Sequence, residues 1–377
     1  MDFILSSIAF ILVFTVLIYV HELGHFWACR WAKIRVEEFG FGLPPRIWGK
    51  KIGKTLWSIN WIPVGGFVKP YGEDSTDEKI LKAKDSFQSA SKLERLVVLA
   101  GGVSMNFLFA FLLLTFVFTI GMHPLAIVPD DSGFSGRSLV FLTESKALER
   151  GLIDEGDVGV KIEKVLETSE FKDVFRAGDR ITKIDNQNII LLSQFLHRKS
   201  SGNREMNVEI ERDGKTIREE ITLGEDRSIG IAISGGTINK ENAFFKFPFY
   251  AAPFYAARET VVLVGENFRM FGKLLTNFKE TSKNVSGPVG IARATDDVVK
   301  TGEFFNILLF TVILSISLGA VNILPLPALD GGRIVFIFYE IIARKRANAR
   351  VENIVNATGM VLLLLLLAIV TFNDLVR

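Results

Sequence analysis

The motif HELGH at residues 21–25 ends an uncharged apolar run that begins at Phe3. In a helix, the i, i+4 spacing puts His21 and His25 on one face, where both imidazoles can bind one zinc ion. Glu22 between them can then act as a base on a metal-bound water. Ionisable side chains in a run apolar enough to cross a membrane indicate a functional site. The alternative is a polar helix end that reaches toward the membrane interface.

The composition of the 377-residue chain favours a membrane protein, since 49% of its residues are hydrophobic and its mean hydropathy is +0.30. The formal net charge of +2 does not indicate nucleic-acid binding, and we expect no such partner. The single cysteine, Cys29, excludes an intrachain disulfide and a CxxC zinc site, and we interpret it as a bystander. The N-terminus lacks the basic region of a signal peptide, so the first apolar run is expected to be retained as a span.

Four segments are long and apolar enough to cross a bilayer: Phe3–Cys29, Leu96–Ile120, Phe304–Leu329 and Ile354–Phe372, approximately. The predicted fold class is therefore a polytopic α-helical membrane protein with about four transmembrane helices. With their flanking residues, these helices are assigned to 1–29, 96–121, 304–332 and 354–373.

The basic residues predict the orientation in the membrane. Lys and Arg are frequent in the connections 30–95 and 333–353, whereas the N-terminus has none. Because basic connections stay on the cytoplasmic side, both termini and the long 121–303 region are expected outside. We predict a multi-pass membrane protein with HELGH toward the cytoplasmic face.

The first connection contains an apolar, aromatic stretch rich in Gly and Pro, residues 57–71. It is too short and too interrupted for a span, but irregular backbone at membrane depth is allowed where it lines a wet cavity. We therefore predict a re-entrant β-like loop beside HELGH. The alternative is an aromatic belt at the membrane interface.

The region 122–236 is predicted to form an inserted extracytoplasmic α/β domain. Strand-like alternation occurs at 158–165 and 206–210, and Asp213-Gly214 is typical of a hairpin turn. The stretch 178–185 and the following residues 194–196 resemble a PDZ domain, with one core at 159–223. Such domains bind extended peptides by strand addition, whereas a structural or size-excluding module is the competing interpretation.

Two further segments are interpreted without a catalytic role. The region 237–303 is predicted to be an amphipathic extracytoplasmic segment, either an interfacial helix on the outer leaflet or a solvated helix packed on the PDZ-like domain. In the second span, small residues at 100–102 permit close helix approach, and Asn106 is interpreted as a packing residue that needs a hydrogen-bond partner.

The third span ends in NILPLPALDGG, residues 322–332. Pro325 and Pro327 interrupt a helix, and Asp330 follows directly. Zinc held by two histidines needs a third protein ligand and leaves a fourth position for water. Asp330 alone is compatible with an ordinary turn carboxylate, but the predicted topology brings it to the same membrane depth as HELGH. We therefore predict Asp330 as the third ligand of one Zn²⁺ ion.

HExxH in the first span together with the Asn-x-x-Pro-x-Pro-x-x-Leu-Asp-Gly pattern resembles the site-2 protease family of intramembrane zinc metalloproteases, especially bacterial members with a PDZ domain. The stretches 65–69 and 286–291 are also similar to that group. The sequence departs from the family in two features. It has one PDZ-like unit, where some members have two, and it has Gly101-Gly102, where Gly-Pro is expected.

The resemblance implies a location in the bacterial cytoplasmic (inner) membrane and a role for each matching residue. It assigns zinc to His21, His25 and Asp330, with Glu22 as the catalytic base. It also implies that Asn322 holds the substrate backbone and that a loop pairs with the substrate as an added strand, the residues being Gly65, Gly66, Phe67, Val68 and Lys69.

The implied activity is hydrolysis of peptide bonds in or near transmembrane segments of single-pass membrane proteins, such as pre-cleaved anti-sigma factors or remnant signal peptides. A membrane metal transporter is one alternative, but it does not explain the glutamate between the histidines or the scarcity of further ligands. Only His123 and His197 remain, and both are expected to be structural or surface residues. An inactive peptide-binding membrane scaffold is the second alternative, and the complete motif set argues against it.

Overall fold

The computed structural model describes residues 2–73, 75, 77–128, 134–152, 159–167, 169–189, 194–195, 198, 204–224, 228–234, 244–276 and 287–376. The chain forms two compact units. One unit combines Met1–Gly121 with Lys246–Arg377, and the other is the inserted segment Met122–Phe245.

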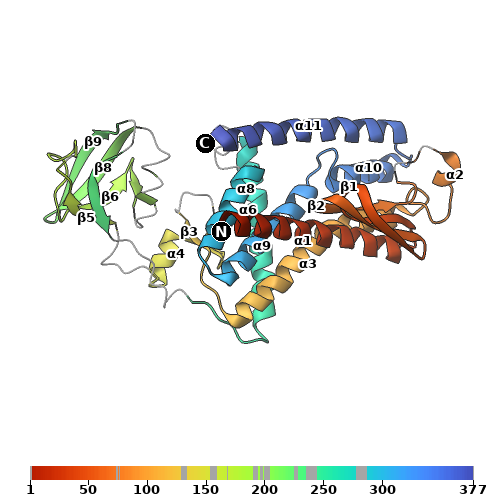
Figure 1. Cartoon of the computed structure of the whole chain (residues 1–377), viewed down its shortest axis with the longest axis horizontal. Helices are drawn as coiled ribbons and strands as arrows, with labels where there is room; N and C mark the ends of the chain where they lie inside the picture. The colour runs from red at the N-terminus through yellow and green to blue at the C-terminus, as the bar shows by residue number, and fades with distance from the viewer. Residues whose placement is uncertain are drawn as a thin grey trace. The chain divides into compact units, whose positions relative to one another are not determined.

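Among the described residues, four helices of the first unit are long and apolar enough to cross a membrane, which agrees with the four segments predicted to do so (Figure 1). They are α1 (Asp2–Trp31), α3 (Lys92–Ile120), α9 (Phe304–Asn322) and α11 (Ala349–Val376). The helices α1 and α3 run a few residues beyond the predicted spans, because helical structure continues into the flanking polar residues.

The helices α1 and α3 touch at glycines. A Cβ added at Gly24 would lie 2.2 Å from the carbonyl oxygen of Gly101, and a Cβ at Gly101 would lie 2.7 Å from the carbonyl oxygen of Gly24. No side chain fits such a backbone contact, so the small residues in the second span do permit the predicted close approach.

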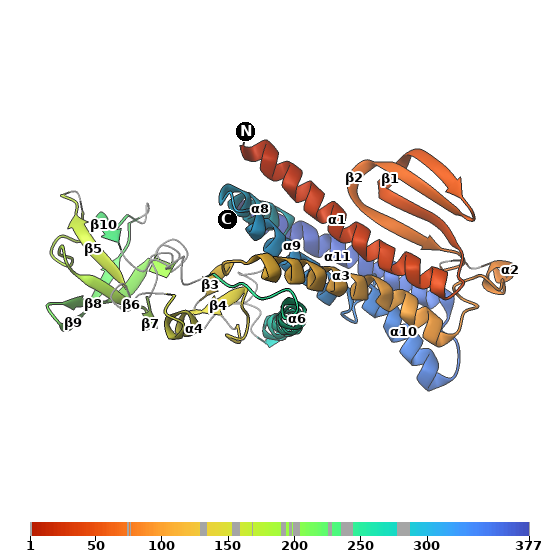
Figure 2. The same cartoon turned by 90° about the horizontal axis from the view of Figure 1, so that it is seen from below.

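The apolar loop after α1 forms a small antiparallel sheet that lies against α1 (Figure 2). Its strands are β1 (Val36–Ile52) and β2 (Thr55–Pro70), and both bend. Residues 36–41 of β1 pair with 66–70 of β2, and residues 38–41 also pair with 56–59 of β2. Buried Phe39 packs its ring edge-on against Tyr19 and Phe26 of α1. The β structure of the loop agrees with the sequence prediction, and its depth in the membrane stays a prediction.

The helix of the third predicted span ends before residue 329, which the sequence analysis gave as the end of this span. The helix α9 stops at Asn322, and a separate helix, α10 (Asp330–Ala343), begins at Asp330. Pro325 and Pro327 have no backbone N–H to continue the helix. Ala328 has a φ of 71°, and its N–H donates to Asn356 Oδ1 of α11 at 3.2 Å.

The helix α10 lies in the predicted cytoplasmic connection and is fixed to the start of α3. Arg95 of α3 forms an ion pair with Glu340 of α10, and both side chains are only 4% exposed. Lys92 Nζ donates to the Glu340 backbone oxygen at 2.8 Å. These contacts hold the helix that starts with Asp330.

Three further helices belong to this unit: α2 (Glu78–Leu81), α6 (Ala252–Thr276) and α8 (Pro288–Lys300). The predicted amphipathic segment contains α6, which packs against α3 and α9. The helix α8 starts beside the end of α11, where Asp374 Oδ2 accepts a hydrogen bond from Gly290 N at 2.8 Å. An interfacial position of α6 on the membrane stays a prediction.

The second unit contains an antiparallel sheet in the order β10-β5-β6-β8-β9, with β7 paired to β6. Its strands are β5 (Val160–Val165), β6 (Arg180–Ile184), β7 (Gln187–Asn188), β8 (Glu205–Arg212), β9 (Lys215–Thr222) and β10 (Ile231–Ser234). A separate pair of short parallel strands, β3 (Ala126–Val128) and β4 (Phe141–Thr143), precedes helix α4 (Glu144–Glu149).

The core of this sheet includes Ile162, Ile181 and Ile210, all fully buried. The strands predicted at 158–165 and 206–210 fall in β5 and β8, and Asp213 and Gly214 form the predicted hairpin turn with positive φ angles of 51° and 70°. Residues 158 and 196, which the sequence assigns to this domain, lie outside the described residues. Its assignment as a PDZ domain stays a prediction.

Candidate metal centre

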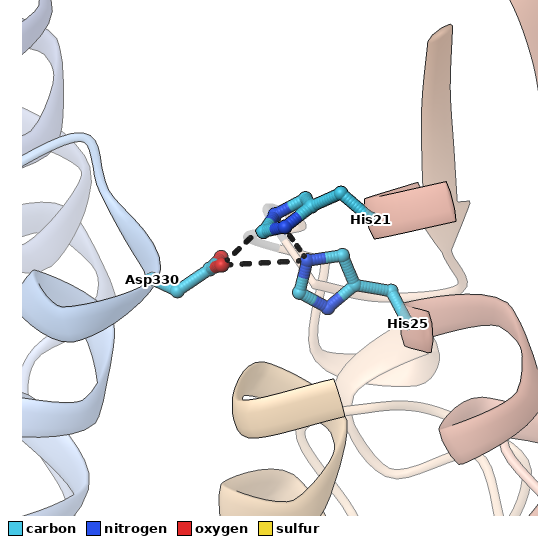
Figure 3. Close-up of side chains that lie close together, drawn as sticks. All are labelled: His21, His25 and Asp330. Carbon is cyan, nitrogen blue, oxygen red and sulfur yellow. Dashed lines mark hydrogen bonds and ion pairs between the residues drawn. The ribbon is translucent and has the colours of Figure 1, made fainter. Parts of the chain in front are cut away.

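Three side chains from α1 and from the start of α10 converge on one point (Figure 3). The His21 and His25 Nε2 atoms are 3.2 Å apart, and Asp330 Oδ2 lies 3.2 Å from the first and 3.4 Å from the second. His21 is 6% exposed, and the Asp330 side chain is 16% exposed. The structure therefore brings the three predicted ligands together across more than 300 residues of sequence.

This triangle fits zinc. Tetrahedral zinc with ligands at about 2.0–2.1 Å needs ligand atoms about 3.3–3.4 Å apart, which is the size of the observed triangle. Asp330 Oδ2 is also a buried oxygen without a hydrogen bond of normal geometry, although both imidazoles face it. A buried carboxylate oxygen is costly when unpaired, and a shared cation would satisfy it. The three residues leave a fourth tetrahedral position for water or substrate.

The imidazoles are oriented by contacts to their other ring nitrogens, both from α3. His25 Nδ1 lies 2.8 Å from the Val98 carbonyl oxygen, so Nδ1–H donates there and Nε2 keeps its lone pair for the metal. His21 Nδ1 lies 3.3 Å from the side-chain amide of Asn106. Between them, Gly102 provides the space for the rings, because a Cβ there would lie 2.4 Å from His25 Nε2.

The predicted base, Glu22, lines the same cavity of about 400 Å³ as the three ligands. Its Oε2 accepts a hydrogen bond from the backbone N–H of Val68 in β2 at 2.9 Å. The sheet therefore holds the carboxylate beside the metal position. The other cavity residues come from α1, β2, α3, α9, α10 and the loops beside them: Ile18, Val68, Pro70, Glu73, Val98, Leu99, Leu318, Asn322, Ala328, Leu329 and Arg333.

Some of the residues predicted to bind substrate lie next to this centre, whereas the exposed Lys69 side chain points elsewhere and pairs with Glu37. Asn322, the last residue of α9, places Nδ2 3.4 Å from His21 Nε2. The 65–69 stretch lies in β2, where Val68 lines the cavity and a Cβ on Gly66 would lie 3.8 Å from Glu22 Cγ.

Several site residues were missed by the sequence analysis. Asn106 was interpreted as a packing residue, because a buried amide in a span is equally explained by a hydrogen bond between helices. Arg333 and Glu73 form an ion pair on the wall of the cavity, and neither residue lies in the motifs used for prediction. The Val98 carbonyl is a backbone group that every residue type has, so the sequence could not predict its role.

The remaining histidines and the cysteine are accounted for differently. His123 lies in the second unit, with its ring 5.3 Å from that of Phe244. His197 is outside the described residues. Cys29, near the end of α1, is completely buried in a hydrophobic cluster, which fits the interpretation as a bystander.

Two histidines and an aspartate on membrane-spanning and adjoining helices, with a glutamate in the same cavity, define a membrane-embedded zinc hydrolase. The chain belongs to peptidase family M50, the site-2 protease family, which matches residues 9–366. Members of this family are zinc-dependent endopeptidases, so the chain is an enzyme rather than a metal transporter or an inactive scaffold.

The similar proteins include the Regulator of sigma-W protease RasP of Bacillus subtilis, 27% identical over 457 residues that cover 100% of this chain and 99% of the relative. Zinc metalloprotease RasP of Oceanobacillus iheyensis is 29% identical and covers 99% of both chains. A candidate zinc metalloprotease of Clostridium perfringens is 30% identical over 97% of both chains. The apolar helices and these bacterial relatives make the chain a protein of the bacterial inner membrane.

Proposed function

We propose that His21, His25 and Asp330 hold the single zinc ion and that Glu22 is the general base of intramembrane peptide hydrolysis. The observation that carries this proposal is the triangle of ligand atoms with sides of 3.2–3.4 Å, with Glu22 in the same cavity. The substrates are single-pass membrane proteins cut in or near their transmembrane segments.

Zinc supplies Lewis-acid chemistry, because it polarises a carbonyl and lowers the pKa of a water to about 7. Glu22 removes a proton from the attacking water as the water oxygen bonds to the peptide carbonyl carbon. The same carboxyl group then gives this proton to the amide nitrogen as the C–N bond breaks. The hydrogen bond from Val68 N–H orients the Glu22 carboxylate for both transfers.

The strand β2 is proposed to present the substrate in extended form. A transmembrane helix hides its carbonyl groups in its own hydrogen bonds, so it must unwind before cleavage. Residues 66–70 pair with 36–41 on one side, and within the described parts of the chain no strand pairs with them on the other. An unpaired strand edge next to Glu22 can bind an unwound segment through main-chain hydrogen bonds. Asn322, beside the metal position, supplies an amide donor for a substrate carbonyl.

The biological setting extends the same proposal. The basic connections favour a cytoplasmic location for the site and an extracytoplasmic location for a PDZ-like second unit. That unit would select or size-exclude substrates. Pre-cleaved anti-sigma factors and remnant signal peptides are short-ectodomain, single-pass proteins of the kind that such a filter admits.

The test is a Glu22→Gln variant of the full-length protein, reconstituted with single-pass membrane segments. Glutamine keeps the shape of glutamate but cannot take a proton, so we expect cleavage to stop while zinc remains bound. A Glu149→Gln variant, changed on the exposed face of α4, serves as the matched control and should retain activity. Substrate trapped on Glu22→Gln can be identified by mass spectrometry. Full cleavage by this variant would remove Glu22 as the base.

A second pair of variants tests the ligands. His21→Ala and Asp330→Ala each remove one corner of the triangle, so purified protein should lose its bound zinc, measured by elemental analysis. Stoichiometric zinc in both variants would contradict the proposed ligand set.

A further inference from the structure

The residue Asn106 occupies an unusual position on α3. It lies one helical turn after Gly102, whose backbone presses against both imidazoles, and its side chain is completely buried. Ser315 Oγ of α9 donates to the Asn106 backbone oxygen at 2.9 Å, which holds this turn of α3 in place. Asn106 is therefore anchored on one side by α9 and directed at the metal centre on the other.

The side-chain amide of Asn106 is incompletely satisfied. Its Nδ2 lies 3.3 Å from His21 Nδ1, whereas its Oδ1 is buried and has no hydrogen-bond partner. Leaving a buried acceptor unpaired costs about 1–3 kcal/mol. The unpaired Oδ1 indicates that the amide can accept a hydrogen bond that it does not make in this orientation.

The chemistry of His21 supplies that bond. Its Nε2 faces Asp330 and His25, so Nε2 is the atom that must keep a lone pair for zinc. A neutral imidazole with its lone pair on Nε2 carries its hydrogen on Nδ1. That N–H needs an acceptor, and a half-turn of the Asn106 amide exchanges Nδ2 for Oδ1 at the same position.

We propose that Asn106 Oδ1 accepts a hydrogen bond from His21 Nδ1–H and so fixes the tautomer and ring orientation that bind zinc. Asn106 is a positioning residue, and the inference rests on the proposed ligand set. The two histidines differ in this respect. His25 is oriented by the Val98 backbone carbonyl, which no substitution removes, whereas His21 depends on a replaceable side chain.

The test compares the zinc affinity of full-length, detergent-solubilised variants by competition with a chromophoric chelator. Asn106→Leu keeps a similar volume but offers no acceptor, and we expect zinc to bind about 10- to 100-fold more weakly. Asn106→Asp restores an acceptor and should return the affinity close to that of the unchanged protein. The control Thr311→Val also removes a buried polar group. This group is the Thr311 hydroxyl on α9, whose hydrogen bond to the Ile307 carbonyl oxygen does not involve the site.

The absorption spectrum of the cobalt-substituted protein gives a second readout, because it reports ligand geometry and not helix packing. We expect a changed spectrum in Asn106→Leu and an unchanged one in Thr311→Val. Should the leucine variant fail to fold, Asn106→Ala, which adds no volume, replaces it with the same expectation.

Three results would overturn the inference. They are unchanged zinc affinity in both acceptor-free variants, zinc binding in Asn106→Asp as weak as in Asn106→Leu, or an equal loss in Thr311→Val. The proposed ligand set is judged separately by His21→Ala. If that variant loses zinc while Asn106→Leu retains it, the ligands stand and the positioning role falls.

Discussion

At the scale of single residues, the metal centre depends on the absence of a side chain at Gly102. A Cβ at Gly102 would lie 2.4 Å from His25 Nε2 and 2.6 Å from His21 Cε1. Carbon and ring atoms cannot approach so closely, so either the imidazoles or α3 would have to move. A movement of α3 away from α1 would also disturb its packing on α9, where Ser315 Oγ donates to the Asn106 backbone oxygen.

We therefore predict that Gly102→Ala binds little or no zinc, although alanine is the better helix former. Zinc content of the purified protein, with its thermal unfolding midpoint, checks this. Gly265→Ala in α6 is the control, because a Cβ there meets no atom within 4 Å and should leave zinc content unchanged. Normal zinc content in Gly102→Ala would show that the rings can be displaced without loss of the site.

The same residues show what the sequence could predict at this scale. His21 and His25 follow from helical spacing, and Asp330 follows from topology and the need for a third ligand. Gly102 and Asn106 could not be assigned, because a glycine and a buried amide in a span are equally explained by helix packing. Only the structure shows that these two residues face the imidazoles rather than another helix.

At the scale of elements, the break between α9 and α10 positions the third ligand. Apolar composition predicted a span through 329 and the two prolines predicted an interruption of its helix, and α9 does end at Asn322, before Pro325 and Pro327. As the first residue of α10, Asp330 also lies at the positive end of the helix dipole. The position of Asp330 therefore depends on how α10 is held, and the buried Arg95–Glu340 pair joins α10 to α3.

We predict that Glu340→Gln destabilises the first unit by about 3–5 kcal/mol, because it leaves Arg95 as a buried cation without its counterion. Because α10 carries Asp330, zinc affinity should fall as well. Thermal unfolding and chelator competition measure the two effects. The control Glu163→Gln changes an exposed ion pair of the second unit and should shift neither value. An unfolding midpoint like that of the control would show that the pair does not hold α10.

At the scale of the whole molecule, the two units have separate hydrophobic cores. The predicted topology puts the helical unit in the membrane and the second unit on the extracytoplasmic side. The helical spans could be recognised from composition, since apolar length alone identifies them. Orientation rests on the basic residues of the connections and is independent of the fold. The single cysteine makes this orientation directly measurable, because Cys29 is fully buried and can be replaced by alanine to give a cysteine-free background.

In that background, Asp213→Cys marks the exposed hairpin between β8 and β9, and Lys345→Cys marks the exposed connection between α10 and α11. If basic connections stay in the cytoplasm, a membrane-impermeant maleimide added to wall-stripped intact cells should label position 213 and not 345. Permeabilised cells should show labelling at both positions, which controls for accessibility. The reverse pattern would put the second unit in the cytoplasm. The proposal that this unit selects substrates on the extracytoplasmic side would then be wrong. Labelling at 213 alone would put the second unit on the extracytoplasmic side, where it can contact the extracytoplasmic part of a substrate.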